Sequence, residues 1–139
     1  MQVAHQTTFT NSIDVVRKLE QYVTNGHFKP TTKFITADVK NLYTMIPRDD
    51  GINALIRFLD KYSKYRKIGP FVIDMILKMA RLILDTNYFA YKDKYYQQKR
   101  GGAMGSAFTQ VFANIYMLEW EQDLIKHQAS KHEIYEQFV

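Results

Sequence analysis

The chain has 139 residues, which suits one modest domain or part of a larger one. Hydrophobic residues make up 46% and aromatic residues 14%, which excludes a disordered chain and is enough for a core. The net charge of +5 is compatible with a polyanionic partner such as nucleic acid. The absence of cysteine excludes disulfides and thiolate metal sites, and it fits an intracellular setting without deciding between nucleus and cytoplasm.

Neither a signal peptide nor a membrane-spanning segment is expected. Residues 1–8 are polar and lack the apolar centre of a signal peptide. The most apolar stretch, residues 71–84, is interrupted by Asp74, Lys78 and Arg81. No membrane partner is therefore predicted.

In chain order, the first half predicts a helix, a strand and two further helices. Asn11 and Ser12 can cap the first helix, whose apolar residues recur at helical spacing. Residues 34–39 are predicted to form a strand, and Asp49-Asp50-Gly51 opens the second helix. Gly69-Pro70 is expected to start the third helix. Its apolar stripe is predicted to be Val72, Met75, Ile76, Met79 and Ile83.

The second half predicts a hairpin, a long helix and a strand. Residues 88–98 are expected to form a β-hairpin turning at Lys92-Asp93, although the usual turn glycine is missing. A small-residue loop leads to a helix from about Ala107 to His127, which is apolar nearly all round at first and so should be buried. Residues 133–139 look like the start of another strand. This order predicts an α+β fold.

Three features could carry chemistry. Asp38 ends the predicted strand, where a carboxylate is costly to desolvate unless a metal, a cation or hydrogen bonds compensate it. Tyr43 follows five residues later, and Gly101, Gly102 and Gly105 form the loop before the long helix. Taken singly, the aspartate can be a cap or ion-pair partner, the tyrosine a packing residue and the glycines a flexible lead-in. The loop is neither a P-loop nor a dinucleotide-binding fingerprint.

Together these segments resemble reverse transcriptases. Residues 34–47, in which Asp38 is followed by Tyr43 and then by Ile46-Pro47, resemble motif A of that family. Residues 101–114, from the glycine loop to Asn114, resemble motif B. The sequence Ala103-Met104-Gly105-Ser106 is most similar to that of Penelope-like retroelement polymerases. The resemblance spans nearly the whole chain, as a partial right-hand palm, an antiparallel sheet packed on helices, with some fingers elements.

The resemblance implies an RNA-directed DNA polymerase that adds dNTPs to a DNA primer on an RNA template. Two divalent ions, Mg²⁺ or Mn²⁺, would assist the transfer. Asp38 would be the catalytic carboxylate that binds both ions, with the Val39 carbonyl as a further ligand. The backbone of Asn41 and Leu42 would lie against the triphosphate. Tyr43 would be a steric gate that fills the space of a ribose 2′-hydroxyl.

Further contacts are implied at the second motif and before it. Met104 and Gly105 would contact the nucleotide, and the glycine would let the backbone approach it closely. Lys99 and Arg100 would bind nucleic acid, together with the cations and tyrosines of the predicted hairpin. Without the family context, a solvated amphipathic hairpin explains those residues equally well.

The chain also departs from the family pattern. Met104, Thr109 and Gln110 stand where glutamine, serine and proline are common. The second catalytic carboxylate motif, Tyr-x-Asp-Asp, is absent, and the family would place it near residues 133–139. The Asp49-Asp50 pair is too close to Asp38 to replace it, and capping is its expected role. We expect a fragment that needs the remaining polymerase, including the thumb, for activity.

Two alternatives stay open at the sequence level. One is the palm of an RNA-dependent RNA polymerase, which Tyr43 disfavours because such enzymes accept a 2′-hydroxyl. The other is a non-catalytic nucleic-acid-binding remnant of a degenerate retroelement, which the basic charge and the missing carboxylate motif favour.

Overall fold

The computed structural model describes residues 8–9, 11–131, 134 and 137–138. Contacts divide the chain into two units, which are described separately: unit 1 comprises residues 1–38 and 121–139, and unit 2 comprises residues 39–120. Helices combine with small, mainly antiparallel two-stranded sheets, so the expected α+β class is confirmed at that level. Within the described residues, no helix has the length and apolar character needed to cross a membrane.

Unit 1 contains helix α1 (Ser12–Thr24), helix α6 (Gln122–Lys131) and a parallel pair of short strands, β1 (Thr8–Phe9) and β6 (Gln137–Phe138). The predicted N-cap of α1 is confirmed: the Asn11 side chain accepts hydrogen bonds from the backbone N–H groups of Ile13 and Asp14, at 2.9 and 3.0 Å. No residue of α1 is fully buried, and its half-buried residues lie at helical spacing: Asp14, Val15, Lys18, Leu19 and Tyr22. The strand expected from residue 133 appears only as β6, and residues 133, 135, 136 and 139 lie outside the described part of the chain.

The prediction of a strand at residues 34–39 is wrong. These residues have no regular secondary structure, and none of them pairs with any described strand. Phe34 is 69% and Ile35 86% exposed. The apolar run has the composition of a buried strand, but a strand is stabilised by neighbouring strands and a packed face, and this segment has neither among the described residues.

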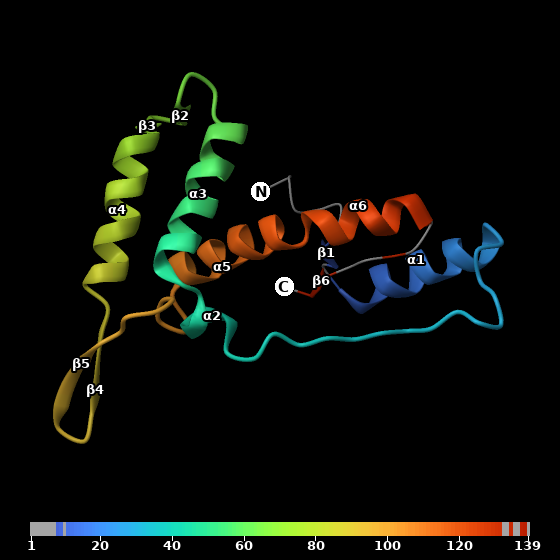
Figure 1. Ribbon diagram of the computed structural model, residues 1–139, viewed down its shortest axis with the longest axis horizontal. Helices are drawn as coiled ribbons and strands as arrows, with labels where there is room; N and C mark the ends of the chain where they lie inside the picture. The colour runs from blue at the N-terminus through green and yellow to red at the C-terminus, as the bar shows by residue number, and fades with distance from the viewer. Residues whose placement is uncertain (1–7, 10, 132–133, 135–136, 139) are drawn as a thin grey trace. The chain divides into compact units, whose positions relative to one another are not determined.

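Unit 2 contains four helices and two hairpins along the chain: α2 (Leu42–Met45), α3 (Arg48–Tyr62), β2 (Lys67–Ile68), β3 (Phe71–Val72), α4 (Ile73–Asp85), β4 (Tyr88–Tyr91), β5 (Lys94–Gln97) and α5 (Ala107–Trp120). Figure 1 shows α3 and α4 running antiparallel side by side, joined at one end by the β2–β3 hairpin. Helix α5 packs against α3 and α2, and the β4–β5 hairpin extends away from the helices.

The core lies between α3, α4 and α5. Its buried side chains are Ile46, Ile52, Leu55, Leu59, Ile73, Ala80, Leu84, Phe112, Ala113 and Ile115. Phe112 is 1% exposed and its ring stacks on that of Phe108, with the centroids 5.6 Å apart. The core of unit 2 thus depends on the helix that follows the glycine loop.

The third predicted helix needs two corrections. Gly69-Pro70 forms the turn between β2 and β3, and α4 begins only at Ile73. The buried positions of α4 are Ile73, Ala80 and Leu84, whereas most of the predicted stripe is exposed. Apolar residues occur on both faces of this helix, so helical spacing identifies the helix and packing against α3 selects the buried face.

Helix starts and ends also differ from the expectations. Asp49 and Asp50 do not cap α3: Pro47 is the N-cap, and the two carboxylates lie in the first turn, where they interact favourably with the helix dipole.

The long helix expected to His127 is interrupted at Glu121, between α5 and α6. Most of α5 is buried or half-buried, as predicted. On its surface Glu119 pairs with Arg57 of α3 at 2.5 Å, and this hydrogen bond raises the pKa of Arg57.

The predicted hairpin is confirmed. Strands β4 and β5 pair antiparallel around Lys92 and Asp93, which have φ angles of 47° and 59°. Two consecutive left-handed residues are what a two-residue type I′ turn requires, and lysine and aspartate adopt them here without glycine.

Candidate functional site

Tyr43 is positioned by a tight turn at the start of unit 2. Asn41 has the left-handed φ of 56°, which asparagine tolerates better than most residues, and its carbonyl accepts hydrogen bonds from the N–H groups of Thr44 and Met45, both at 3.1 Å. The four-residue helix α2 follows, and the buried Ile46 anchors it in the core. The turn therefore fixes the backbone that carries the Tyr43 ring.

Two backbone hydrogen bonds join this turn to the glycine loop. The N–H of Gly101 donates to the carbonyl of Ile46, and the N–H of Gly102 donates to the carbonyl of Tyr43, both at 2.8 Å. Gly101 has φ of 53°, and a Cβ there would overlap the backbone of Tyr43 and Thr44. The two segments that resemble motifs A and B are therefore in direct contact.

Gln98, which was not predicted as a site residue, also holds this loop. Its side-chain amide donates to the carbonyls of Arg100 at 2.8 Å and Gly102 at 3.0 Å. Its own Oε1 accepts a hydrogen bond from the Asn87 side chain at 3.0 Å, and its backbone carbonyl accepts one from Arg48. Nothing in the sequence distinguishes this glutamine from other polar residues, and Lys99 and Arg100 separate it from the first glycine of the loop.

The loop leads into α5 through Ser106. The Ser106 hydroxyl accepts from the N–H of Thr109 at 3.4 Å, in the manner of an N-cap, and its carbonyl accepts from the N–H of Gln110 at 3.1 Å. Thr109 is buried against Gly102, where any Cβ would overlap its side chain. The start of α5 is thus fixed relative to the loop.

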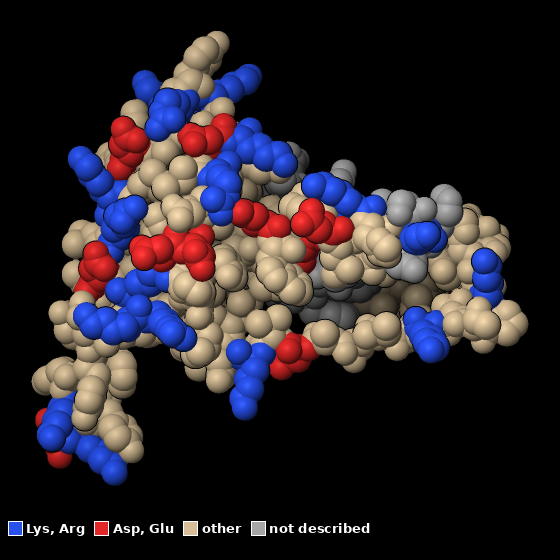
Figure 2. All heavy atoms as spheres, in the orientation of Figure 1, with Lys and Arg blue, Asp and Glu red and all other residues tan. Residues whose placement is uncertain are grey.

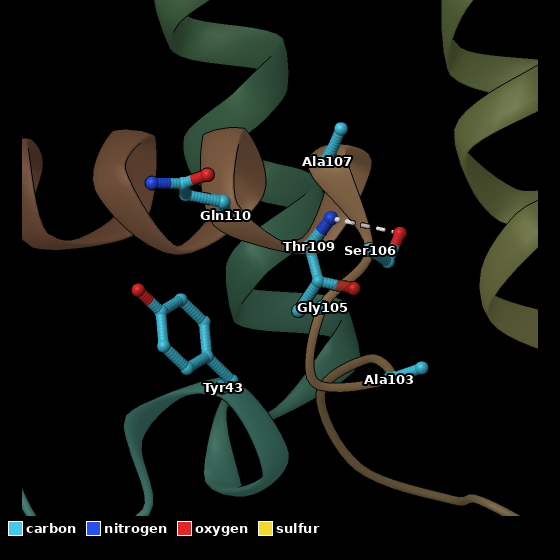
Figure 3. Close-up of a pocket in the computed structure, with 7 residues that line it drawn as sticks. All are labelled: Tyr43, Ala103, Gly105, Ser106, Ala107, Thr109 and Gln110. Carbon is cyan, nitrogen blue, oxygen red and sulfur yellow. Dashed lines mark hydrogen bonds between the residues drawn. The ribbon is translucent and has the colours of Figure 1, made fainter.

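A pocket of about 350 Å³ lies between the Tyr43 turn and the start of α5. It is lined by Tyr43, Ala103, Gly105, Ser106, Ala107, Thr109 and Gln110. Figure 3 shows the Tyr43 ring rising from its turn toward α5, with its hydroxyl directed to the side on which Gln110 lies. Gly105 has φ of 82° and no atom near the position of a Cβ, so the loop is open there.

Tyr43 and Gly105 are the two predicted nucleotide-binding residues that meet in this pocket. Asn41 and Leu42 precede it and are not among the residues that line it. Met104 also does not line the pocket and is 71% exposed. The side chains of Lys99 and Arg100 are exposed between the hairpin and the loop.

The predicted metal ligands Asp38 and Val39 are both exposed. Asp38 belongs to unit 1, whereas the pocket lies in unit 2. Among the described residues no group of three or more His, Cys, Asp or Glu side chains could hold a metal ion. Two-metal chemistry needs several carboxylates around a pair of ions. One carboxylate and one carbonyl are therefore an incomplete donor set for that purpose.

Comparisons with known protein families, with curated proteins and with solved structures give no match for this chain.

Proposed function

We propose that the chain is part of an RNA-directed DNA polymerase, a partial palm with some fingers elements, most like the Penelope-like retroelement enzymes. One observation carries the proposal. Tyr43 and the loop that contains Gly105 come from segments far apart in the sequence, and each segment resembles a reverse transcriptase motif. The two segments line one pocket and are hydrogen-bonded to each other.

The pocket has the features that selection of a deoxynucleotide would use. Its volume of about 350 Å³ falls within the range of roughly 300–1,000 Å³ that is usual for small-molecule sites. An aromatic ring forms one wall, and a glycine without a neighbouring side chain leaves the backbone accessible on the other side. In this proposal the Tyr43 ring excludes a 2′-hydroxyl, and Gly105 lets the nucleotide approach the loop.

The other predicted residues have the following proposed roles. Asp38 and the Val39 carbonyl are this chain's proposed ligands for Mg²⁺ or Mn²⁺, and the other carboxylates come from the rest of the polymerase. Divalent ions, when bound, would neutralise the triphosphate and activate the primer hydroxyl. The positively charged side chains of Lys99 and Arg100 are proposed to bind the backbone of the template or primer.

The gate can be tested by nucleotide binding. In the presence of an RNA–DNA template–primer and Mg²⁺, we expect the chain to bind dCTP more tightly than CTP, which differs only by its 2′-hydroxyl. Tyr43→Ala removes the ring, and we expect it to reduce this preference by about tenfold. Equilibrium dialysis with radiolabelled nucleotides measures the dissociation constants of dCTP and CTP.

Tyr43→Phe is the matched control, because it keeps the ring and should keep the preference. Equal binding of dCTP and CTP by the unmodified chain would contradict the gate assignment. A preference for CTP would instead favour the RNA-polymerase alternative.

The incomplete donor set leads to a second expectation. In a primer-extension assay with an RNA template, a DNA primer, dNTPs and either Mg²⁺ or Mn²⁺, the 139-residue chain alone should yield no extended product. The physical reason is that Asp38 lacks the further carboxylates that would hold two ions. Robust extension that disappears in Asp38→Asn would show that this reasoning is wrong.

A non-catalytic nucleic-acid-binding remnant remains the second candidate. It is favoured by the absence, among the described residues, of a carboxylate cluster. RNA binding with a steep salt dependence, but with no discrimination between dCTP and CTP, would support it over the polymerase fragment.

A further inference from the structure

The β4–β5 hairpin has two chemically different faces. Cross-strand partners lie on the same face of a hairpin, and the register pairs Phe89 with Tyr96 and Tyr91 with Lys94. We call this set the cationic aromatic face. The opposite face carries Tyr88, Ala90, Tyr95 and Gln97, with no cation among its strand residues.

Rings and positive charge are placed together on the cationic aromatic face. The rings of Phe89 and Tyr96 are stacked, with centroids 5.6 Å apart and planes at 21°. The Lys92 ammonium lies 5.3 Å from the centroid of the Tyr91 ring. Every one of these side chains is exposed. Figure 2 shows Lys and Arg atoms gathered at the tip of this hairpin.

The positive charge of the hairpin region favours a polyanionic partner over a partner without negative charge. Between residues 88 and 100 there are four cationic side chains and one carboxylate, Asp93. A two-stranded hairpin is marginally stable by itself, and both faces of this one are exposed to solvent. An occupant that stacks on the rings and neutralises the lysines would therefore stabilise it.

We propose that the cationic aromatic face binds single-stranded RNA, with bases stacking on Tyr91 and on the Phe89–Tyr96 pair while Lys92 and Lys94 contact phosphates. Unpaired bases expose a ring face that a duplex hides, and rings beside a positively charged track are a recurrent arrangement for single strands. The identity of the strand as the template rests on the proposed function. The hairpin is also tied to the pocket, because Gln98, directly after β5, holds the glycine loop.

The test is fluorescence anisotropy with labelled oligouridine at low salt, using the whole chain. Tyr91→Ala should weaken binding about tenfold. Tyr95→Ala is the matched control: it removes the same side chain from the opposite face, where Tyr95 is 84% exposed, and should change binding by less than about twofold. Lys94→Gln keeps all rings and should lower the slope of log affinity against log salt by about 0.7. Circular dichroism checks that each variant stays folded.

Several results would overturn the inference. They are equal losses in Tyr91→Ala and Tyr95→Ala, binding of an RNA duplex as tight as that of the single strand, and displacement of RNA by polyglutamate as effective as by unlabelled oligouridine. The last result would indicate an acidic protein partner. The outcome is separable from that of the proposed function: face-specific RNA binding without dCTP preference would retain the hairpin site and reject the polymerase pocket.

Discussion

Gly101→Ala is expected to destabilise unit 2 by about 2–4 kcal/mol and to disrupt the pocket, because two costs add at this residue. The left-handed backbone, with φ of 53°, is unfavourable for alanine. The new Cβ would also overlap the backbone of Tyr43 and Thr44, which cannot rotate away as a flexible side chain could. Urea denaturation followed by circular dichroism measures the loss, and dCTP binding should weaken in parallel.

Gly105→Ala is the matched control. Gly105 also has a positive φ, 82°, but no atom lies near its Cβ position. Only the conformational cost applies, so the expected loss is about 1 kcal/mol. Equal losses in the two variants would mean that the contact between the glycine loop and the Tyr43 turn does not stabilise the chain.

Phe112→Ala should have the largest effect on stability, about 3–5 kcal/mol, because it leaves a cavity where α3 and α5 meet. The ring is fully buried, stacks on Phe108 and lies so close to Gly51 that a Cβ there would overlap it. A glycine and a phenylalanine from different helices therefore fit together as one contact. The free energy of unfolding in urea is the quantity to measure.

Val111→Ala is the control for this variant. Val111 precedes Phe112 on the same helix, and 41% of its surface is exposed. Its truncation should cost less than about 1 kcal/mol. A Phe112→Ala variant as stable as Val111→Ala would show that α5 does not pack on α3 as described.

The parts of the fold that were predicted correctly have a local physical cause. Asn11 carries its own capping group, so it marks the start of α1. The aromatic residues on both sides of Lys92-Asp93 mark the hairpin. The errors concern elements whose outcome depends on distant partners. Residues 34–39 have strand-like composition without a strand to pair with, and α4 has two apolar faces, of which α3 covers one.

In the candidate site, too, some residues could be predicted from the sequence and others could not. The family resemblance named Tyr43 and Gly105, and the structure brings them into one pocket, although their roles stay predictions. Gln98 could not be identified because its contribution consists of hydrogen bonds to loop carbonyls, and any polar side chain looks the same in a sequence. Met104 was predicted from its motif position, yet it is not among the residues that line the pocket and its side chain is largely exposed.

The network around Gln98 also has a consequence for the order in which the molecule folds. Arg48 and Gln98 are 50 positions apart in the sequence, and the bonds between the glycine loop and the Tyr43 turn span a similar separation. Closing so long a loop costs entropy that only later contacts repay, so helices α3 and α4 should form before these bonds. During synthesis the tyrosine turn would leave the ribosome well before the glycine loop. The pocket should therefore be among the last parts of unit 2 to form. When the hydrogen bonds between the glycine loop and the Tyr43 turn are weakened, opening of the pocket should be detectable as fast amide exchange at Gly101 and Gly102.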